Sequence, residues 1–320
     1  MKTKLGAATY RFTQAFSTQI LVGTGGWAYF PIAEGSRLQA YSRVFNFVEV
    51  NNTFYEYPDT HKVEGWRRIV PASFTFAVRC HQDLTHRLGL KPSDEASRVL
   101  GQMQNYCNIL GTPYLVLETP PSYIFNKKNV EDARVLLSSS NLKRLCLVWE
   151  NRAPLTPNGQ TMMQDLNIIH SVDLSRQTPF FSSDVIYTRL FGKGKHNVYQ
   201  FTDEELEEIA HKVLTSKAKT VALSYHGVRM NSDALRFTSY LKTGSFPSIT
   251  QFRGVDSAKA VLSEDAKFPS SKQSLIEDQG WKVFDATSSR RIHLSEWLVQ
   301  IPDKIYTNVE EVAHALEAAR

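Results

Sequence analysis

A carboxylate interrupts an apolar run in the first fifth of the chain. Phe47-Val48-Glu49-Val50 is aromatic and β-branched apart from Glu49, as a buried strand would be. Side chains alternate along a strand, so Glu49 shares a face with Phe47 and with Asn51, which follows the strand. A carboxylate on a buried face is costly unless it is paired. Glu49 therefore predicts either a structural ion pair or one wall of a binding site.

Polar and ionisable side chains stand at the ends of the predicted strands. They are Trp27, Glu49, Asn51, Arg79, His81, Glu118, Glu150, Arg152, Asp173, Arg189 and His226. In a barrel of parallel strands the carboxyl ends meet at one rim, which is where the active sites of such barrels lie. We therefore expect these side chains to gather around a single opening.

Glu150 and Arg152 have the spacing of a charge-assisted pair. In a functional site Glu150 would transfer protons, and Arg152 would tune its proton affinity. In a purely structural role the pair would clamp two loops together. Arg189 has the fork geometry to hold a phosphate or carboxylate with two hydrogen bonds. The loop that follows Arg189 carries Lys193, Lys195 and His196, and it is either an extension of the anion site or a solvated basic turn.

The same rim carries metal-ligand types, but their spacing does not favour a metal site. The candidate ligands are Glu49, Glu118, Glu150, Asp173, His81, His86 and His226. The sequence has no His-x-His or His-Glu-x-x-His pattern, and the three rim arginines would compete for the carboxylates. We predict no cofactor and keep a divalent metal as the alternative.

Six aromatic residues are also expected near this rim, and they support two interpretations. They are Trp27, Tyr29, Phe54, Tyr55, Tyr57 and Trp149. Beside arginines they would stack sugars or bases. The alternative is a packed cap over the barrel mouth.

The predicted elements alternate between strands and helices, which favours parallel strands joined by crossover helices. Strands are expected at 20–23, 47–50, 74–79, 114–118, 145–149, 172–174, 185–189 and 220–225. Helices are expected at 36–44, 60–69, 93–110, 129–137, 161–169, 202–214 and 231–241. Residues 176–184 are too few for a helix, so the prediction is a distorted (β/α)8 TIM-like barrel, with an open doubly wound sheet as the alternative.

The chain divides by composition into an N-terminal tail (1–18), the barrel (19–255) and a small C-terminal extension (256–320). Residues 257–273 are rich in Ser, Lys and Asp and indicate a linker or surface segment, whereas 309–319 predicts a terminal amphipathic helix. The extension is expected either to cover the barrel or to form a homodimer.

Net charge and cysteine content restrict the class of protein. The chain has 320 residues and a net charge of +5, which permits an anionic partner without requiring one. Its three cysteines, Cys80, Cys107 and Cys146, form no Cys-x-x-Cys pair, which argues against a disulfide framework or an iron–sulfur site. No signal peptide or membrane span is predicted, so the expected location is the cytoplasm.

Several of these motifs resemble one known family. Gly23-Thr24-Gly25-Gly26-Trp27, Val48 to Tyr55, and Val148-Trp149-Glu150-Asn151-Arg152 are similar to the YecE-like proteins, also called domain of unknown function seventy-two. The resemblance implies a TIM-barrel-like fold, similar to the endonuclease IV and xylose isomerase barrels, and no settled activity. Two positions depart from the family pattern. Phe191 stands where the family has His, and Ser224-Tyr225-His226-Gly227 replaces an aromatic-Asn-Asn motif.

Together these observations predict a site for an anionic ligand, a phosphate-bearing sugar or nucleic acid, with hydrolase or lyase chemistry favoured. Glu150 is the predicted general acid/base and Glu49 the second catalytic carboxylate. The predicted ligand-binding residues are Trp27, Asn51, Asn52, Tyr55, Arg79, His81, Arg152, Arg189 and His226. The alternatives are a non-catalytic nucleic-acid-binding module and a dimeric scaffold.

Overall fold

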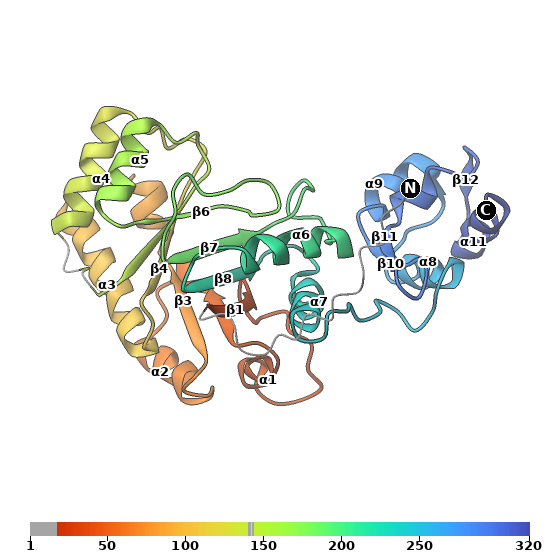
Figure 1. Ribbon diagram of the computed structural model, residues 1–320, viewed down its shortest axis with the longest axis horizontal. Coiled ribbons are helices and arrows are strands. Elements are labelled where there is room, and N and C mark those ends of the chain that lie inside the picture. The colour runs from red at the N-terminus through yellow and green to blue at the C-terminus, as the bar shows by residue number, and fades with distance from the viewer. Residues whose placement is uncertain (1–17, 140–141, 143) are drawn as a thin grey trace. The chain divides into compact units, whose positions relative to one another are not determined.

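The computed structural model describes residues 18–139, 142 and 144–320, which form two compact units (Figure 1). The barrel unit contains residues 18–190 and 216–226, and the C-terminal unit contains residues 191–215 and 227–320. The predicted N-terminal tail lies, except for Thr18, outside the described residues. The predicted boundary between residues 255 and 256 stays a prediction.

Eight parallel strands build the barrel unit. They are β1 (Gln19–Thr24), β2 (Phe47–Val50), β3 (Thr75–Arg79), β4 (Tyr114–Thr119), β5 (Cys146–Asn151), β6 (Ile169–Ser171), β7 (Val185–Leu190) and β8 (Thr220–Tyr225). Their order is β6-β5-β4-β3-β2-β1-β8-β7, so the first strand lies beside the eighth. Between β6 and β7 the described residues show one parallel bridge, Val172 with Thr188. The predicted distorted (β/α)8 barrel is confirmed, with its irregularity at the seam between β6 and β7.

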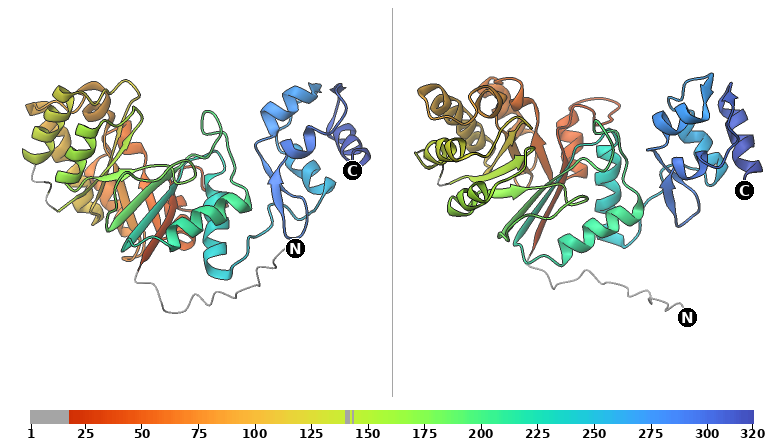
Figure 2. Two further views of the ribbon diagram at one scale, coloured as in Figure 1. Left: turned by 45° about the horizontal axis from the view of Figure 1, so that its top comes forward. Right: turned by 90° about the horizontal axis from the view of Figure 1, so that it is seen from above.

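Helices follow the first five strands of the barrel unit, and each begins at a local signal. They are α1 (Arg37–Val44), α2 (Thr60–Arg68), α3 (Asp94–Leu110), α4 (Lys127–Ser139) and α5 (Pro157–Asp165), with a 3₁₀ turn at Asn52–Phe54 and a π-turn at Asp83–Arg87. Ser93 caps α3 by accepting a hydrogen bond from the Ala96 N–H, and Gly111 ends that helix at a φ of +65°. In both views of Figure 2, α3, α4 and α5 lie on the outside of the strands.

Two predicted elements were misplaced. The helix predicted at 161–169 is α5, Pro157–Asp165, because the Thr156 side chain caps it and Pro157 occupies its first turn. Strand six was predicted at 172–174, but β6 is Ile169–Ser171. Since α5 ends earlier than predicted, the chain enters the sheet earlier. Residues 172–184, all of which the structure describes, contain no helix between β6 and β7, as predicted.

A layer of buried, mostly apolar side chains fills the barrel interior. It consists of Leu21, Phe47, Ala77, Tyr114, Val116, Val148, Ile169, Tyr187 and Ala222, all buried. Every strand except β3 and β8 places a long or branched interior residue in it, and Ala77 and Ala222 complete the layer from those two strands. The interior is therefore a packed core, and polar groups at the carboxyl ends of the strands have an apolar floor beneath them.

The C-terminal unit has a core of its own. Its elements are α6 (Asp203–Leu214), α7 (Met230–Thr243), α8 (Val255–Leu262), β9 (Ser270–Ser271), α9 (Lys272–Gln279), β10 (Val283–Asp285), β11 (Arg291–His293), α10 (Ser295–Leu298), β12 (Ile305–Tyr306) and α11 (Val309–Ala318). The linker predicted at 257–273 was wrong, because α8 places Ala258, Val261 and Leu262 in this core. The terminal helix is confirmed as α11. No helix in the part of the chain that the structure describes is long and apolar enough to cross a membrane.

A buried ion network connects α6 and α7 to the hairpin of β10 and β11. Asp203 accepts from Arg236 Nη2 at 2.5 Å and from Arg291 Nη1 at 3.0 Å, and Arg291 Nε also donates to Asp285 at 3.1 Å. All four side chains are buried. Removing one member of such a network leaves its partners charged and desolvated.

We predict that Asp203→Ala destabilises the chain by about 3 kcal/mol, because two buried guanidinium groups lose a counterion. The measurement is urea unfolding followed by circular dichroism. Glu204→Ala is the matched control, because Glu204 is the next residue and its side chain is 59% exposed. Its expected cost is below about 0.5 kcal/mol. Equal effects of the two substitutions would contradict a structural role for the network.

Candidate functional site

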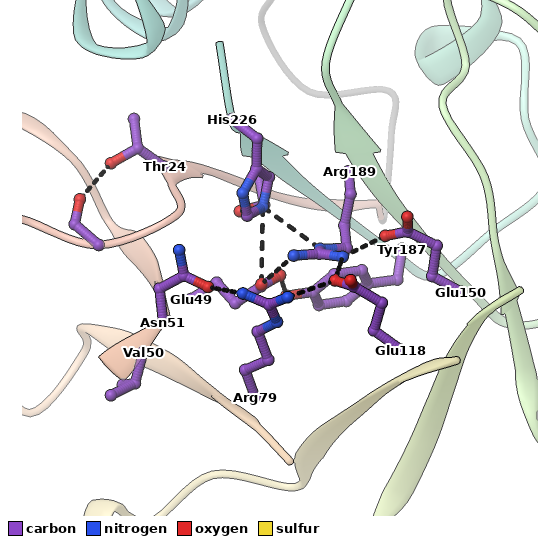
Figure 3. A network of polar contacts seen from close by, with 12 residues as sticks. Thr24, Glu49, Val50, Asn51, Arg79, Glu118, Glu150, Tyr187, Arg189 and His226 are labelled. Atoms are coloured by element: carbon purple, nitrogen blue, oxygen red, sulfur yellow. Dashed lines mark hydrogen bonds and ion pairs between the residues drawn. The ribbon is translucent and has the colours of Figure 1, made fainter. Parts of the chain in front are cut away.

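Arg189 is the centre of a cluster of carboxylates at the mouth of the barrel (Figure 3). It lies near the end of β7, and its side chain is 2% exposed. Its guanidinium contacts Glu49 Oε1 from β2 at 3.0 Å, Glu118 Oε2 from β4 at 2.5 Å, and the Glu150 carboxylate from β5. Four strands that are distant in sequence thus meet at one side chain, as the parallel arrangement predicted.

Two further arginines balance the charge of the three carboxylates. Arg79 Nη2 donates to Glu118 Oε2 at 2.6 Å, and another nitrogen of its guanidinium donates to Asn51 Oδ1. Arg152 reaches Glu118 Oε1 at 2.9 Å and Glu150 Oε1 at 3.4 Å. Three carboxylates therefore face three guanidinium groups. This balance is what makes the burial of so many charges tolerable.

His226 and Tyr187 complete the shell around Glu49. The Tyr187 hydroxyl donates to Glu49 Oε2 at 2.8 Å. His226 Nε2 lies 3.6 Å from Glu49 Oε1 and 3.3 Å from Arg189 Nε. Gly25 leaves room for this ring, since a Cβ at that position would lie 2.4 Å from it. The glycine-rich loop after β1 therefore serves close packing against His226.

The electrostatics keep the cluster in one protonation state. Burial alone would raise the pKa of Glu49, but Arg189, His226 and Arg79 outweigh it and hold that pKa well below its usual range. The pKa of Glu118 is lowered in the same way, against burial, by Arg189, Arg79 and Arg152. Burial would lower the pKa of Arg189, but the three carboxylates raise it well above its usual value. At neutral pH these groups are ionised and poorly suited to gain or lose a proton.

Accessibility rises from the centre of the cluster to its edge. The side chains of Glu49 and Glu118 are 0% and 3% exposed, Glu150 is 14% exposed and Arg152 is 42% exposed. A ligand entering the barrel mouth would therefore meet Arg152 and Glu150 before any other charged member of the cluster. The buried groups behind them act as a fixed support.

The structure brings together most, but not all, of the predicted site residues. Those that meet are Glu49, Asn51, Arg79, Glu150, Arg152, Arg189 and His226. Tyr55 lies at the margin: its ring is 63% exposed, and its centroid is 5.8 Å from Arg79 Cζ.

Three predicted residues interact elsewhere. Trp27 packs edge-on against Trp66, and Asn52 donates to the Glu56 side chain. His81 stacks on Tyr57 and lies 3.4 Å from Asp83. None of these contacts is with a member of the arginine cluster. Whether they touch a ligand stays a prediction.

Two members of the cluster were missed as site residues. Glu118 was named as a strand-end carboxylate and a candidate metal ligand but not as a site residue, although it ends an apolar strand much as Glu49 interrupts one. Tyr187 stands two residues before Arg189 in a motif similar to the family's, but no role was predicted for it, because a tyrosine in a buried strand is ordinary core. The metal alternative is not favoured by the arrangement, since the three carboxylates converge on a guanidinium. Among the described residues no group of three His, Cys, Asp or Glu side chains is placed to hold a metal ion.

Comparison with known proteins gives a family and a fold. The family described as "Protein of unknown function DUF72" matches residues 21–247. The UPF0759 protein YunF of Bacillus subtilis is 29% identical over 153 residues, a match that covers 43% of this chain and 53% of YunF. The chain thus spans about half the length of this curated relative.

Solved structures of two DUF72 family proteins have a similar fold. The protein from Thermotoga maritima has a TM-score of 0.56 and 21% identity, over 70% of this chain and 99% of its own. The protein from Enterococcus faecalis has a TM-score of 0.55 and 17% identity, over 70% of this chain and 98% of its own. Residues 248–320 lie outside the family match.

We predict that Arg189→Met destabilises the chain by about 3–5 kcal/mol at pH 7, because Glu49 is left buried without its guanidinium partner. The pH dependence should also change sign. In the wild type the depressed pKa of Glu49 and Glu118 gives stability that is full above their ordinary value of 4.5 and is lost as the pH falls below it. In the variant, burial raises the pKa of Glu49, so stability should increase as the pH falls from 7 to 5.

Urea unfolding at the two pH values measures both effects. Arg144→Met is the matched control, because Arg144 is exposed and precedes β5 at the opposite end of the barrel from the cluster. A variant at Arg189 as stable as this control at pH 7 would contradict the account of the cluster.

Proposed function

The chain belongs to the DUF72 family, and we propose that its barrel mouth binds a small ligand that carries an anionic group, such as a phosphorylated sugar or a nucleic-acid fragment. The observation that carries the proposal is the position of Arg152. Its side chain is 42% exposed, yet its guanidinium is paired with Glu118 and Glu150. A pre-positioned guanidinium at the carboxyl end of a barrel strand suits bidentate recognition of a phosphate or carboxylate.

The surroundings of Arg152 favour a ligand with a ring. Tyr55 presents an exposed aromatic face near Arg79, and Arg79 itself stacks over Phe54 with 3.7 Å between its Cζ and the ring centroid. Aromatic and arginine faces together stack sugars and bases. Asn51 adds an amide that is already oriented by Arg79. The proposal therefore uses Arg152, Tyr55 and Asn51 as ligand contacts.

Glu150 is the carboxylate that we propose for acid/base chemistry. It is the most exposed of the three cluster carboxylates and lies beside Arg152. Glu49 was predicted as a second catalytic group, but it is fully enclosed by Arg189, Tyr187 and His226. We therefore give Glu49 a positioning role, in which it orients Arg189. Hydrolase or lyase chemistry on the bound ligand would require proton transfer, and Glu150 is the most accessible cluster carboxylate for that role.

We predict that Arg152→Ala weakens binding of a sugar phosphate by about 10- to 100-fold, the usual value of a charge-assisted hydrogen-bonded pair. Isothermal titration with ribose 5-phosphate and with inorganic phosphate measures this. Arg144→Ala, an exposed arginine before the same strand, should leave the affinity unchanged. Equal affinity in the two variants, or no binding of either probe to the wild type, would contradict the proposal.

We predict that Glu150→Gln keeps the affinity within about threefold but lowers turnover by at least about 100-fold, the usual contribution of a general acid or base. The assay is phosphate release or bond cleavage across a panel of sugar phosphates and short oligonucleotides. Binding without turnover in the wild type would reject catalysis and leave a binding module. Oligonucleotide affinity that falls steeply with salt would then favour the nucleic-acid alternative.

A further inference from the structure

A cavity of about 320 Å³ lies beside β6 and β7. It exists because the barrel is irregular there. One bridge joins β6 to β7 in the described residues, and residues 172–184 connect them without a helix (Figure 1). In a regular barrel a helix would pack beside these strands. Here the connecting loop takes its place, and the cavity is lined by that loop and by strand residues that include Ile169 of the interior layer.

The wall of the cavity is held in a defined position by His170. The His170 ring stacks on Phe180, with 5.1 Å between the ring centroids and 22° between the planes. The Phe180 N–H donates to His170 Nδ1 at 3.3 Å, so the ring proton is on Nε2, which lies 2.8 Å from Asn151 Oδ1. Burial lowers the pKa of His170 to about 4, so the ring is neutral at physiological pH. Phe180 is therefore fixed although it is 59% exposed.

The lining is apolar with one charge at its edge. Ile169, Ile186, Phe180 and Phe181 supply apolar surface, and Ser182 and Ser183 supply hydroxyl groups. Lys217 is the one ionised side chain among the lining residues. The nearby Lys219 and Asp184 side chains form an ion pair at 2.7 Å, so their opposite charges neutralise each other. The cavity thus presents a hydrophobic surface, an aromatic ring and a single ammonium group.

We propose that this cavity binds a small aromatic carboxylate, with the ring against Phe180 and the carboxylate toward Lys217. The volume is near the lower end of the range of about 300–1,000 Å³ that holds small ligands, which suits a molecule with one ring. The site is separate from the barrel mouth. It is lined by Val185, which begins β7, and by residues just before β8, whereas the arginine cluster lies at the carboxyl ends of the strands.

The test uses the full chain, 3-phenylpropanoate as the probe and isothermal titration. A single-ring ligand of this size is expected to bind with a dissociation constant of about 1 mM. Phe180→Ala should weaken binding by about tenfold, the value of one buried aromatic contact. Lys217→Met should weaken it by at least about fivefold. The uncharged analogue 3-phenylpropanamide should bind the wild type as weakly as the acid binds the Lys217 variant.

Two control variants keep the proposal falsifiable. Lys219→Met removes an exposed lysine two residues away, and Arg152→Ala alters the barrel mouth; both should leave the affinity for 3-phenylpropanoate unchanged. If Phe180→Ala perturbs the loop, the comparison of Lys217→Met with Lys219→Met still decides the question. Absence of saturable binding, equal affinity for acid and amide, or equal effects of the two lysine substitutions would overturn the proposal.

Discussion

A buried guanidinium surrounded by carboxylates determines the arrangement of the barrel mouth. Each charge taken out of water costs several kcal/mol, and the cost is offset only when the partners lie at hydrogen-bond distance. The partners of Arg189 come from β2, β4 and β5, whereas Arg189 comes from β7. No pair of neighbouring strands is able to satisfy it. The cluster is therefore stable only when the sheet has curled far enough to bring β7 opposite β4, so closure of the barrel and formation of the site are the same event.

The apolar layer beneath the cluster strengthens it. Phe47 and Tyr187 lie in this layer, and the Tyr187 hydroxyl is the polar contact between the layer and Glu49. Because the charged groups of the cluster lie on this apolar layer, they interact through a low effective dielectric. A low dielectric strengthens ion pairs and hydrogen bonds and so favours one fixed set of pairings. The same pairing removes Glu49 and Glu118 from proton transfer at neutral pH. The charged side chains of the cluster that stay accessible are Glu150 and Arg152, at its edge.

The convergence of these residues was predictable from sequence, but their pairings were not. Eight apolar β-branched segments with polar ends predict a parallel barrel with a charged rim, and Glu49 showed that the charge extends into a strand. Which arginine meets which carboxylate depends on strand stagger, and strand stagger leaves no local signal. Trp27 and His81 were expected at the rim for the same reason as Arg79, yet the contacts they make are with Trp66 and Tyr57, outside the arginine cluster. Composition also failed at residues 257–273, because frequent Ser and Lys obscured the apolar stripe of α8.

The end of β5 connects the regular and irregular parts of the barrel unit. Side chains alternate along a strand, so Glu150 and Arg152 face the arginine cluster while Asn151 faces the other way, toward His170. His170 in turn holds Phe180 over the seam that lacks a helix. A buried imidazole bonded at both nitrogens thus replaces part of the packing that a crossover helix would provide. The ion cluster fixes the inner side of β5 through Glu150. The outer side of the same strand, at Asn151, holds His170 and through it the loop that replaces the helix.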